Sequence, residues 1–195
     1  MVTTLSALAR SAGSARPLWP LFAALRPVGA RAIIPLVCAL MAAGPAAALS
    51  CLPWGASDGY LQAEASDRAF LVVAGTLHFD QSALPQAPAQ DPNNVPPETA
   101  IAARLAGAQL TSKGFSQPVD LALTLNIRCL GPWCGSAEDG QSYLAFVEQR
   151  PTGLVLDMRP CGGAGFADPE GTAAAEVLTC HQGGPCVPLV DQLSE

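Results

Sequence analysis

Six cysteines constrain this chain more than any other feature of its sequence. The 195 residues contain seven, and all but Cys38 lie after residue 50, at Cys51, Cys129, Cys134, Cys161, Cys180 and Cys186. An even number in a domain of this size predicts structural disulfides, and the spacings leave their connectivity open. Because disulfides persist in oxidising compartments, the cysteines also predict an exported protein.

A metal site is the alternative use of the same cysteines. Cys129 and Cys134 stand in CLGPWC, and Cys180, His181 and Cys186 stand in CHQGGPC, so thiolates and an imidazole lie near one another along the chain. Neither spacing is the C-x-x-C of common zinc modules or of redox enzymes. We therefore favour disulfides and expect no metal and no cofactor.

An export signal precedes the cysteines. Residues 1–50 hold four arginines and no acidic residue, and an apolar run, AIIPLVCALMAA, lies near their end. The small residues Ala46 and Ala48 follow the run. A basic region, an apolar run and small residues in this order are typical of a secretory signal peptide. The run is shorter than a membrane-spanning helix requires and contains a proline, so we expect no transmembrane anchor.

The end of this leader allows several interpretations. Small residues suit cleavage near residues 48–50, either before Leu49 or before Cys51. Cys51 could also be the acylated residue of a lipoprotein, although acylation would leave an odd number of cysteines. An arginine-rich, acid-free leader also suits organelle targeting, but the apolar run is not needed for that purpose. We favour export to the periplasm or the exterior, with residues 51–195 as one mature domain.

Without the leader the domain is strongly acidic. Six of the ten basic residues and all sixteen acidic residues lie after residue 50, so the formal charge changes from −6 for the whole chain to −10. An acidic surface repels phosphate backbones, so we expect no nucleic-acid partner. About 145 residues are enough for a single domain with its own core.

Alternating hydrophobicity predicts a mainly β domain. In the clearest strand, residues 119–129, one face carries Val119, Leu121, Leu123, Leu125, Ile127 and Cys129, and the other carries Asp120, Thr124, Asn126 and Arg128. Further strands are expected at 70–79, 99–110, 143–148 and 154–159. The last two read as a hairpin, and Gly75 in the first suits a crowded position or a bend.

Short helices are expected at both ends of the domain. Ser57 and Asp58 are cap residues for a helix over 57–69, and Asp168 begins another that ends near residue 179. Residues 80–98 contain five prolines and predict a long exposed loop. This order of elements predicts a five-stranded antiparallel barrel of the OB-fold type, stapled by disulfides, with a small β-sandwich as the alternative.

Several short motifs follow one another in a familiar order. Cys51 opens the mature domain, Val73–Gly75 reads V-x-G, and Lys113–Gly114 ends the next strand. The densest stretch, CGSAEDGQSYLAF, begins at Cys134, and Cys161 follows the last apolar strand. In this order the motifs resemble the netrin-like module, whose best-known members are the tissue inhibitors of metalloproteinases. The resemblance implies an OB fold.

The resemblance also implies a disulfide between Cys51 and Cys134, which leaves Cys129 to pair with Cys161 and the last two cysteines to pair with each other. The inhibitors bind a protease zinc through the amino group and carbonyl of their first cysteine. Cys51 would have that role only if cleavage falls immediately before it. This chain lacks the second cysteine of the family's opening Cys-x-Cys, which removes part of the supporting scaffold.

Three functions follow from these observations. The first is a non-enzymatic exported module that binds a protein or another ligand, with Cys51, Trp54 and Trp133 as the expected contact region; packing against disulfides is the alternative role of the two tryptophans. The second is a metalloprotease inhibitor acting through Cys51. The third, an extracytoplasmic hydrolase, lacks a G-x-S-x-G or H-E-x-x-H motif, and His78 and His181 are the only histidines, so we expect no catalytic residues.

Overall fold

The structure of this protein is a computed structural model that describes residues 49–193. The leader expected over residues 1–50 therefore lies outside the described residues, apart from Leu49 and Ser50. Within the part of the chain that is described, no helix is long and apolar enough to cross a membrane.

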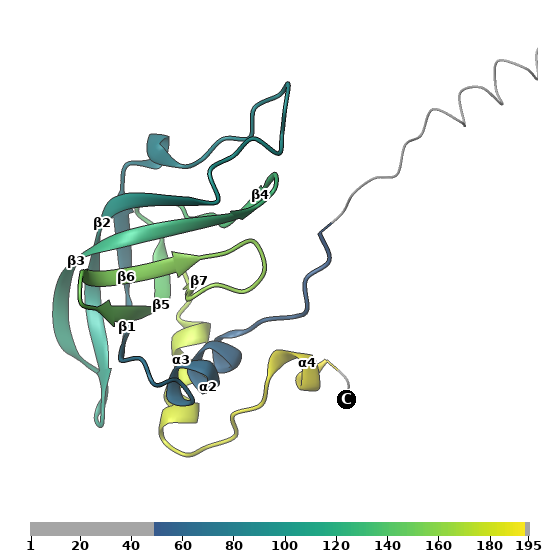
Figure 1. Cartoon of the computed structure of the whole chain (residues 1–195). Coiled ribbons are helices and arrows are strands. Elements are labelled where there is room, and N and C mark those ends of the chain that lie inside the picture. The colour runs from purple at the N-terminus through teal and green to yellow at the C-terminus, as the bar shows by residue number, and fades with distance from the viewer. Residues whose placement is uncertain (1–48, 194–195) are drawn as a thin grey trace, which may run out of the picture. The chain divides into compact units, whose positions relative to one another are not determined.

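The domain is mainly β, as the alternation predicts, with a few short helices (Figure 1). Its strands are β1 (Phe70–Phe79), β2 (Glu98–Thr111), β3 (Gly114–Leu130), β4 (Trp133–Cys134), β5 (Ser142–Arg150), β6 (Gly153–Met158) and β7 (Gly165–Ala167). The helices are α2 (Ala56–Glu64), η1 (Gln81–Ala83, a 3-10 helix), α3 (Thr172–His181) and α4 (Leu189–Gln192). Each of the five predicted strands is present, and β3 extends further towards the amino terminus than expected.

The pairings of five strands form a closed path. β1 pairs with β2, β2 with β3, β3 with β6 and β6 with β5, and β5 pairs with β1 again. Residues 73–76 of β1 have partners on both sides, β2 on one and β5 on the other. β4 pairs with β3 outside this path, and β7 pairs with β5.

One pairing corrects the expectation of a wholly antiparallel arrangement. β3 and β6 run parallel, with Asn126 opposite Asp157, whereas the other four pairings of the path are antiparallel. The reason is geometric, because strand directions cannot alternate all the way round a closed path with an odd number of members. The sheet is therefore mixed.

Two apolar cores lie on opposite faces of the strands. The alternation of β3 places Leu123, Leu125 and Ile127 in the inner core, together with Val73, Leu77, Leu105, Val147 and Leu156. The outer core lies under the helices and contains Ala56, Leu144, Phe146 and Val177. α2 and α3 lie side by side at this face (Figure 1), where Ser57 N donates to Glu176 Oε1 at 3.2 Å. Burial of each large apolar side chain contributes roughly 1.5–3 kcal/mol.

Gly75 and Gly107 face each other across β1 and β2. A Cβ on Gly107 would overlap the carbonyl oxygen of Ala74, and one on Gly75 would overlap that of Ala106. The two backbones thus approach too closely for any side chain, which confirms that Gly75 relieves crowding.

The helices begin and end at different residues from those expected. α2 spans Ala56–Glu64 rather than 57–69, and Asp58 accepts a hydrogen bond from Gly55 N at its start, at 2.8 Å. α3 begins after Gly171, whose φ of 76° lies in the left-handed region. Asp168 still stabilises this helix, since its carboxylate accepts hydrogen bonds from the N–H groups of residues 173 and 174. The strands β4 and β7 and the helix α4 were not predicted, because segments of two to four residues carry almost no periodic signal.

All six cysteines after residue 50 form disulfides: Cys51–Cys161, Cys129–Cys134 and Cys180–Cys186. The structure therefore differs from the Cys51–Cys134 bridge that the netrin-like resemblance implies. Cys129 and Cys134 are opposite residues of the β3–β4 pair, so the hairpin itself brings them together. Cys51 instead joins the amino-terminal segment to the loop after β6.

Candidate functional site

The disulfide at Cys51 places two residues of the expected contact region beside one loop. Cys51 is exposed and is bonded to Cys161, the first residue of the sequence Cys161-Gly162-Gly163. Trp54 packs on the same loop, because its indole Nε1 donates a hydrogen bond to the Gly163 carbonyl at 3.1 Å. A Cβ on Gly162 would lie 2.7 Å from Cγ of this ring, so only glycine fits under it.

Trp133, the third residue of that region, lies elsewhere. It forms part of β4, pairs with Leu130 and is half-buried. It is absent from the residues that line the pocket at Trp54. Both tryptophans are close to a disulfide in sequence or space, which agrees with packing as one of their roles.

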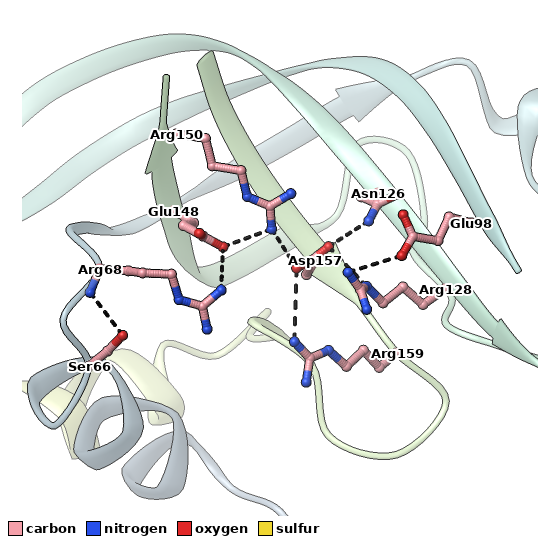
Figure 2. Close-up of polar contacts among 9 residues, drawn as sticks. All are labelled: Ser66, Arg68, Glu98, Asn126, Arg128, Glu148, Arg150, Asp157 and Arg159. Atoms are coloured by element: carbon pink, nitrogen blue, oxygen red, sulfur yellow. Dashed lines mark hydrogen bonds and ion pairs between the residues drawn. The ribbon is translucent and has the colours of Figure 1, made fainter. Parts of the chain in front are cut away.

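Next to Trp54, charged side chains gather on the outer face of β3, β6 and β5 (Figure 2). Four of the six basic residues after residue 50 take part, namely Arg68, Arg128, Arg150 and Arg159. They surround two carboxylates, Glu148 and Asp157, whose side chains are only 10% and 8% exposed. The remaining members are Asn126 and Glu98.

Strand register explains why these residues meet. Asn126 is opposite Asp157 in the parallel pair, and Glu98 is opposite Arg128 in the β2–β3 pair. Glu148 is opposite Val155, which lies two residues before Asp157 on the same face of β6. Six members of the cluster therefore occupy outward-facing positions of four neighbouring strands, whereas Arg68 lies just before β1 and Arg159 just after β6.

Arg150 bridges the two buried carboxylates. Its Nη2 atom donates to Glu148 Oε2 at 2.7 Å and to Asp157 Oδ2 at 2.9 Å. Asp157 Oδ1 also accepts a hydrogen bond from the Asn126 amide at 2.7 Å. The Nε of Arg128 is buried 3.5 Å from the same oxygen, as an ion pair without hydrogen-bond geometry. These contacts hold both carboxylates in fixed positions.

The arginines keep the two carboxylates ionised. The pKa of Glu148 is lowered, mainly by its hydrogen bond from Arg150, with further lowering by the charge of Arg68. For Asp157, burial is the largest influence and acts to raise the pKa. The hydrogen bond from Asn126 and the neighbouring guanidinium charges together outweigh it, so the net shift is downward. The pKa of Arg150 is raised, chiefly by its hydrogen bond to Glu148.

A pocket of about 140 Å³ opens beside the cluster. Its apolar walls include Trp54, Phe70, Phe146 and Val155, and its polar lining includes Gln62, Arg68, Glu148, Asp157 and Arg159. A second pocket of about 330 Å³ shares Arg159 and Cys161 with the first and is otherwise lined by residues such as Pro97, Leu130 and Pro160. Arg159 thus lies between two adjoining pockets.

Each of the two histidines in residues 49–193 lies beside one polar side chain. His78 Nδ1 lies 3.4 Å from Asp139 Oδ1, and both side chains are about half exposed. His181 Nδ1 lies 3.2 Å from the Tyr60 hydroxyl. Within this described part, no three His, Cys, Asp or Glu residues are arranged to hold a metal ion.

The arginine cluster was not among the site residues expected from the sequence. The available signal was the position of Asn126, Arg128, Glu148 and Asp157 on strands whose other residues are mostly apolar. A charged residue amid such strands is informative, because it must find a partner when its neighbours are buried. Arg68 carries no such signal, since it precedes β1 by two residues and meets Glu148 only in the folded chain.

Searches of protein-family models, of curated proteins and of solved structures find no significant match to this chain.

Proposed function

We propose that this chain is an exported, disulfide-bonded binding module that recognises its ligand at the pocket between Trp54 and the arginine cluster. Three disulfides suit an oxidising compartment, and the basic, apolar and small-residue order of the leader suits export. The partner is a ligand encountered outside the cytoplasm.

We also propose that the closed path of five strands is an OB-fold-like barrel of the netrin-like kind. Support comes from the pairing of β1 with both β2 and β5 and from an apolar core on the inward-facing residues. Proteins of this architecture commonly bind ligands at their strands and connecting loops. The pocket lies at such a place, between β5, β6 and the loop that follows β6.

The binding role is carried by one observation: most of the domain's basic side chains converge on two buried carboxylates at the mouth of a pocket. Buried ion pairs are a poor source of stability, because desolvation of the charges offsets their attraction. A cluster of charged groups with shifted pKa values that lines a pocket is instead typical of a functional site. Because the described residues that line the pocket include no activated nucleophile or base, binding is the activity that they support.

Metalloprotease inhibition through Cys51 is the second candidate. One observation favours it, since Cys51 and its neighbours form an exposed segment before α2 in which Leu52 is 83% exposed. The bridge to Cys161 rather than Cys134 differs from the family pattern. Amino-terminal sequencing of the exported protein discriminates, because a mature chain that begins at Leu49 has no free amino group at Cys51.

Blocking the pocket tests the binding proposal. Gln62 lies on the exposed surface of α2 and lines the pocket, so Gln62→Trp fills its mouth without disturbing the core. Leu61→Trp adds the same ring one residue away, outside the lining. A thermal-shift screen of the mature domain should find ligands, from a set of anionic, neutral and cationic compounds, that stabilise the wild type and Leu61→Trp but not Gln62→Trp. The proposal would be overturned if the ligands stabilised both variants equally. It would also be overturned if no ligand stabilised the wild type or either variant.

A further inference from the structure

We infer that the ligand is a small monocarboxylate, whose carboxylate group binds between the guanidinium groups of Arg68 and Arg159 while an adjoining apolar group packs on Trp54. This inference rests on the proposed binding function and adds the chemical class of the ligand.

The cluster holds one positive charge more than its own carboxylates neutralise. Glu98 lies 3.0 Å from Arg128, and Arg150 satisfies both Glu148 and Asp157. Four guanidinium groups therefore face three carboxylates. The excess lies at the rim of the pocket, where the side chains of Arg68 and Arg159 are 57% and 42% exposed. An anion placed there completes the charge balance.

Arg68 and Arg159 differ in how firmly they are held. Arg68 lies 3.1 Å from Glu148 Oε2, and its guanidinium carbon is 5.9 Å from the centre of the Phe70 ring, a cation–π distance. Arg159 reaches Asp157 Oδ2 only at 3.9 Å and has no hydrogen-bond partner among residues 49–193. One guanidinium is thus pre-organised, and the other has donors to spare for a ligand (Figure 2).

The walls and size of the pocket define the rest of the ligand. Trp54, Phe70 and Phe146 provide aromatic surface close to the two guanidinium groups. At about 140 Å³ the pocket is smaller than most ligand sites, so a short apolar or single-ring group suits the space beside the carboxylate. A longer ligand would continue past Arg159 into the second pocket.

Charge also argues against the other ligand classes. The cluster has a single uncompensated positive charge and the domain as a whole is strongly acidic, so the second negative charge of a dianion such as phosphate is disfavoured. A cationic ligand is disfavoured because the arginines at the rim would repel it and the carboxylates are already paired with Arg150. A neutral ligand would leave the Arg159 donors without an acceptor.

Matched pairs of ligands test the inference. The mature domain with Trp133→Phe retains Trp54, whose fluorescence reports on the pocket. Benzoate and phenylacetate should bind, whereas benzamide and phenylacetamide, of the same shape without the charge, should bind at least about tenfold more weakly. Binding of the acids should weaken as salt increases, since rim charges are screened. Inorganic phosphate, a dianion, and benzylammonium, a cation, should both bind more weakly than phenylacetate.

Variants assign the interaction to residues. Arg159→Gln should weaken phenylacetate binding about tenfold or more, and Arg159→Lys should weaken it less, because the charge remains while the paired donors are lost. Arg104→Gln is the matched control, since Arg104 is an exposed arginine paired with Asp120 away from the pocket. Near-ultraviolet circular dichroism should show that all three variants are folded.

The outcomes separate this inference from the proposed function. Amides that bind as tightly as the acids, or an Arg159→Gln variant with unchanged affinity, would overturn the carboxylate assignment and leave the binding role intact. Failure of every carboxylate at about 10 mM would also overturn it. The Gln62→Trp comparison with the broader ligand set then decides whether the pocket binds anything.

Discussion

Asn126 and Asp157 are opposite residues of the one parallel strand pair in the closed path, and the Asn126 amide nitrogen lies 2.7 Å from a carboxylate oxygen of Asp157. Both residues are 6% exposed. The parallel pairing follows from the odd number of strands, and it is this pairing that brings a buried amide to a buried carboxylate. Topology thus helps to fix the position of Asp157, which lines the pocket.

Substitution of Asn126 tests this contact. Asn126→Ala removes a hydrogen bond to a charged group and should lower the free energy of unfolding by about 1.5–3 kcal/mol at pH 7. Asn126→Asp places a second carboxylate beside Asp157 and should destabilise the domain more at pH 7 than at pH 4.5, where one carboxylate of the pair binds a proton. Urea denaturation at both pH values measures the difference. Thr124→Ala, on the same strand face, is the control, and an Asn126→Asp variant with no pH-dependent loss would contradict the prediction.

Acid should destabilise the domain through Glu148 and Asp157. Their pKa values in the folded protein lie below the ordinary values of 4.5 and 3.8. The unfolded chain therefore takes up protons at a higher pH than the folded chain does. The stabilisation is present above the ordinary pKa values and is lost as the pH falls through the lowered ones.

The measurement is the free energy of unfolding in urea at a series of pH values from 7 to 3. The Glu148→Gln, Asp157→Asn double variant should be less stable at pH 7 and should lose less stability on acidification than the wild type. Parallel curves for the two proteins would show that other carboxylates cause the acid sensitivity.

The close approach of Gly75 and Gly107 predicts a strong effect of adding a single methyl group. Gly107→Ala would press a Cβ into the carbonyl of Ala74, which belongs to the backbone and has little freedom to move. We expect a loss of about 3 kcal/mol or more, or failure to fold. Thermal unfolding of the purified domain and its soluble yield measure this effect. Ala106→Ser, exposed on the same strand, should leave both nearly unchanged.

Two of the three disulfides, Cys51–Cys161 and Cys180–Cys186, should differ in their contributions to stability. Cys51 and Cys161 are 110 residues apart, whereas Cys180 and Cys186 are 6 apart. In the chain-entropy model, closing the longer loop stabilises by about 5 kcal/mol and closing the shorter one by about 2 kcal/mol. Paired Cys→Ser variants compared by urea denaturation should therefore rank in that order, and the opposite ranking would show that strain or residual structure dominates.

Much of the fold could be predicted from local patterns. Apolar β-branched runs, alternation and a hairpin turn located five strands, and alternation located the buried face of β3. The turn residues at Lys113 and Gly114 located the end of β2. Helix boundaries were less accurate, because Gly171 shortens α3 and Asp168 acts on that helix from outside it. Such capping depends on how the chain bends before the helix, which residue type alone does not specify.

The candidate site was harder to predict than the strands. Cys51 and Trp54 were expected in a contact region and do lie beside the pocket, through the bridge to Cys161 and the hydrogen bond to Gly163. The arginines were not expected, and Trp133 lies away from that lining. Charged residues separated by tens of positions carry no sign of one another in the sequence.

By itself the sequence determined which residues of β3 face inward and that six cysteines are available for bridges, because both depend on residue type and short-range spacing. Only the tertiary structure decided that β3 lies parallel to β6, that Cys51 meets Cys161, and that Arg68 reaches Glu148 across 80 residues. Each of these depends on which distant segments become neighbours. Strand pairing and burial of the whole domain decide which distant segments become neighbours, so no local sequence pattern encodes these contacts.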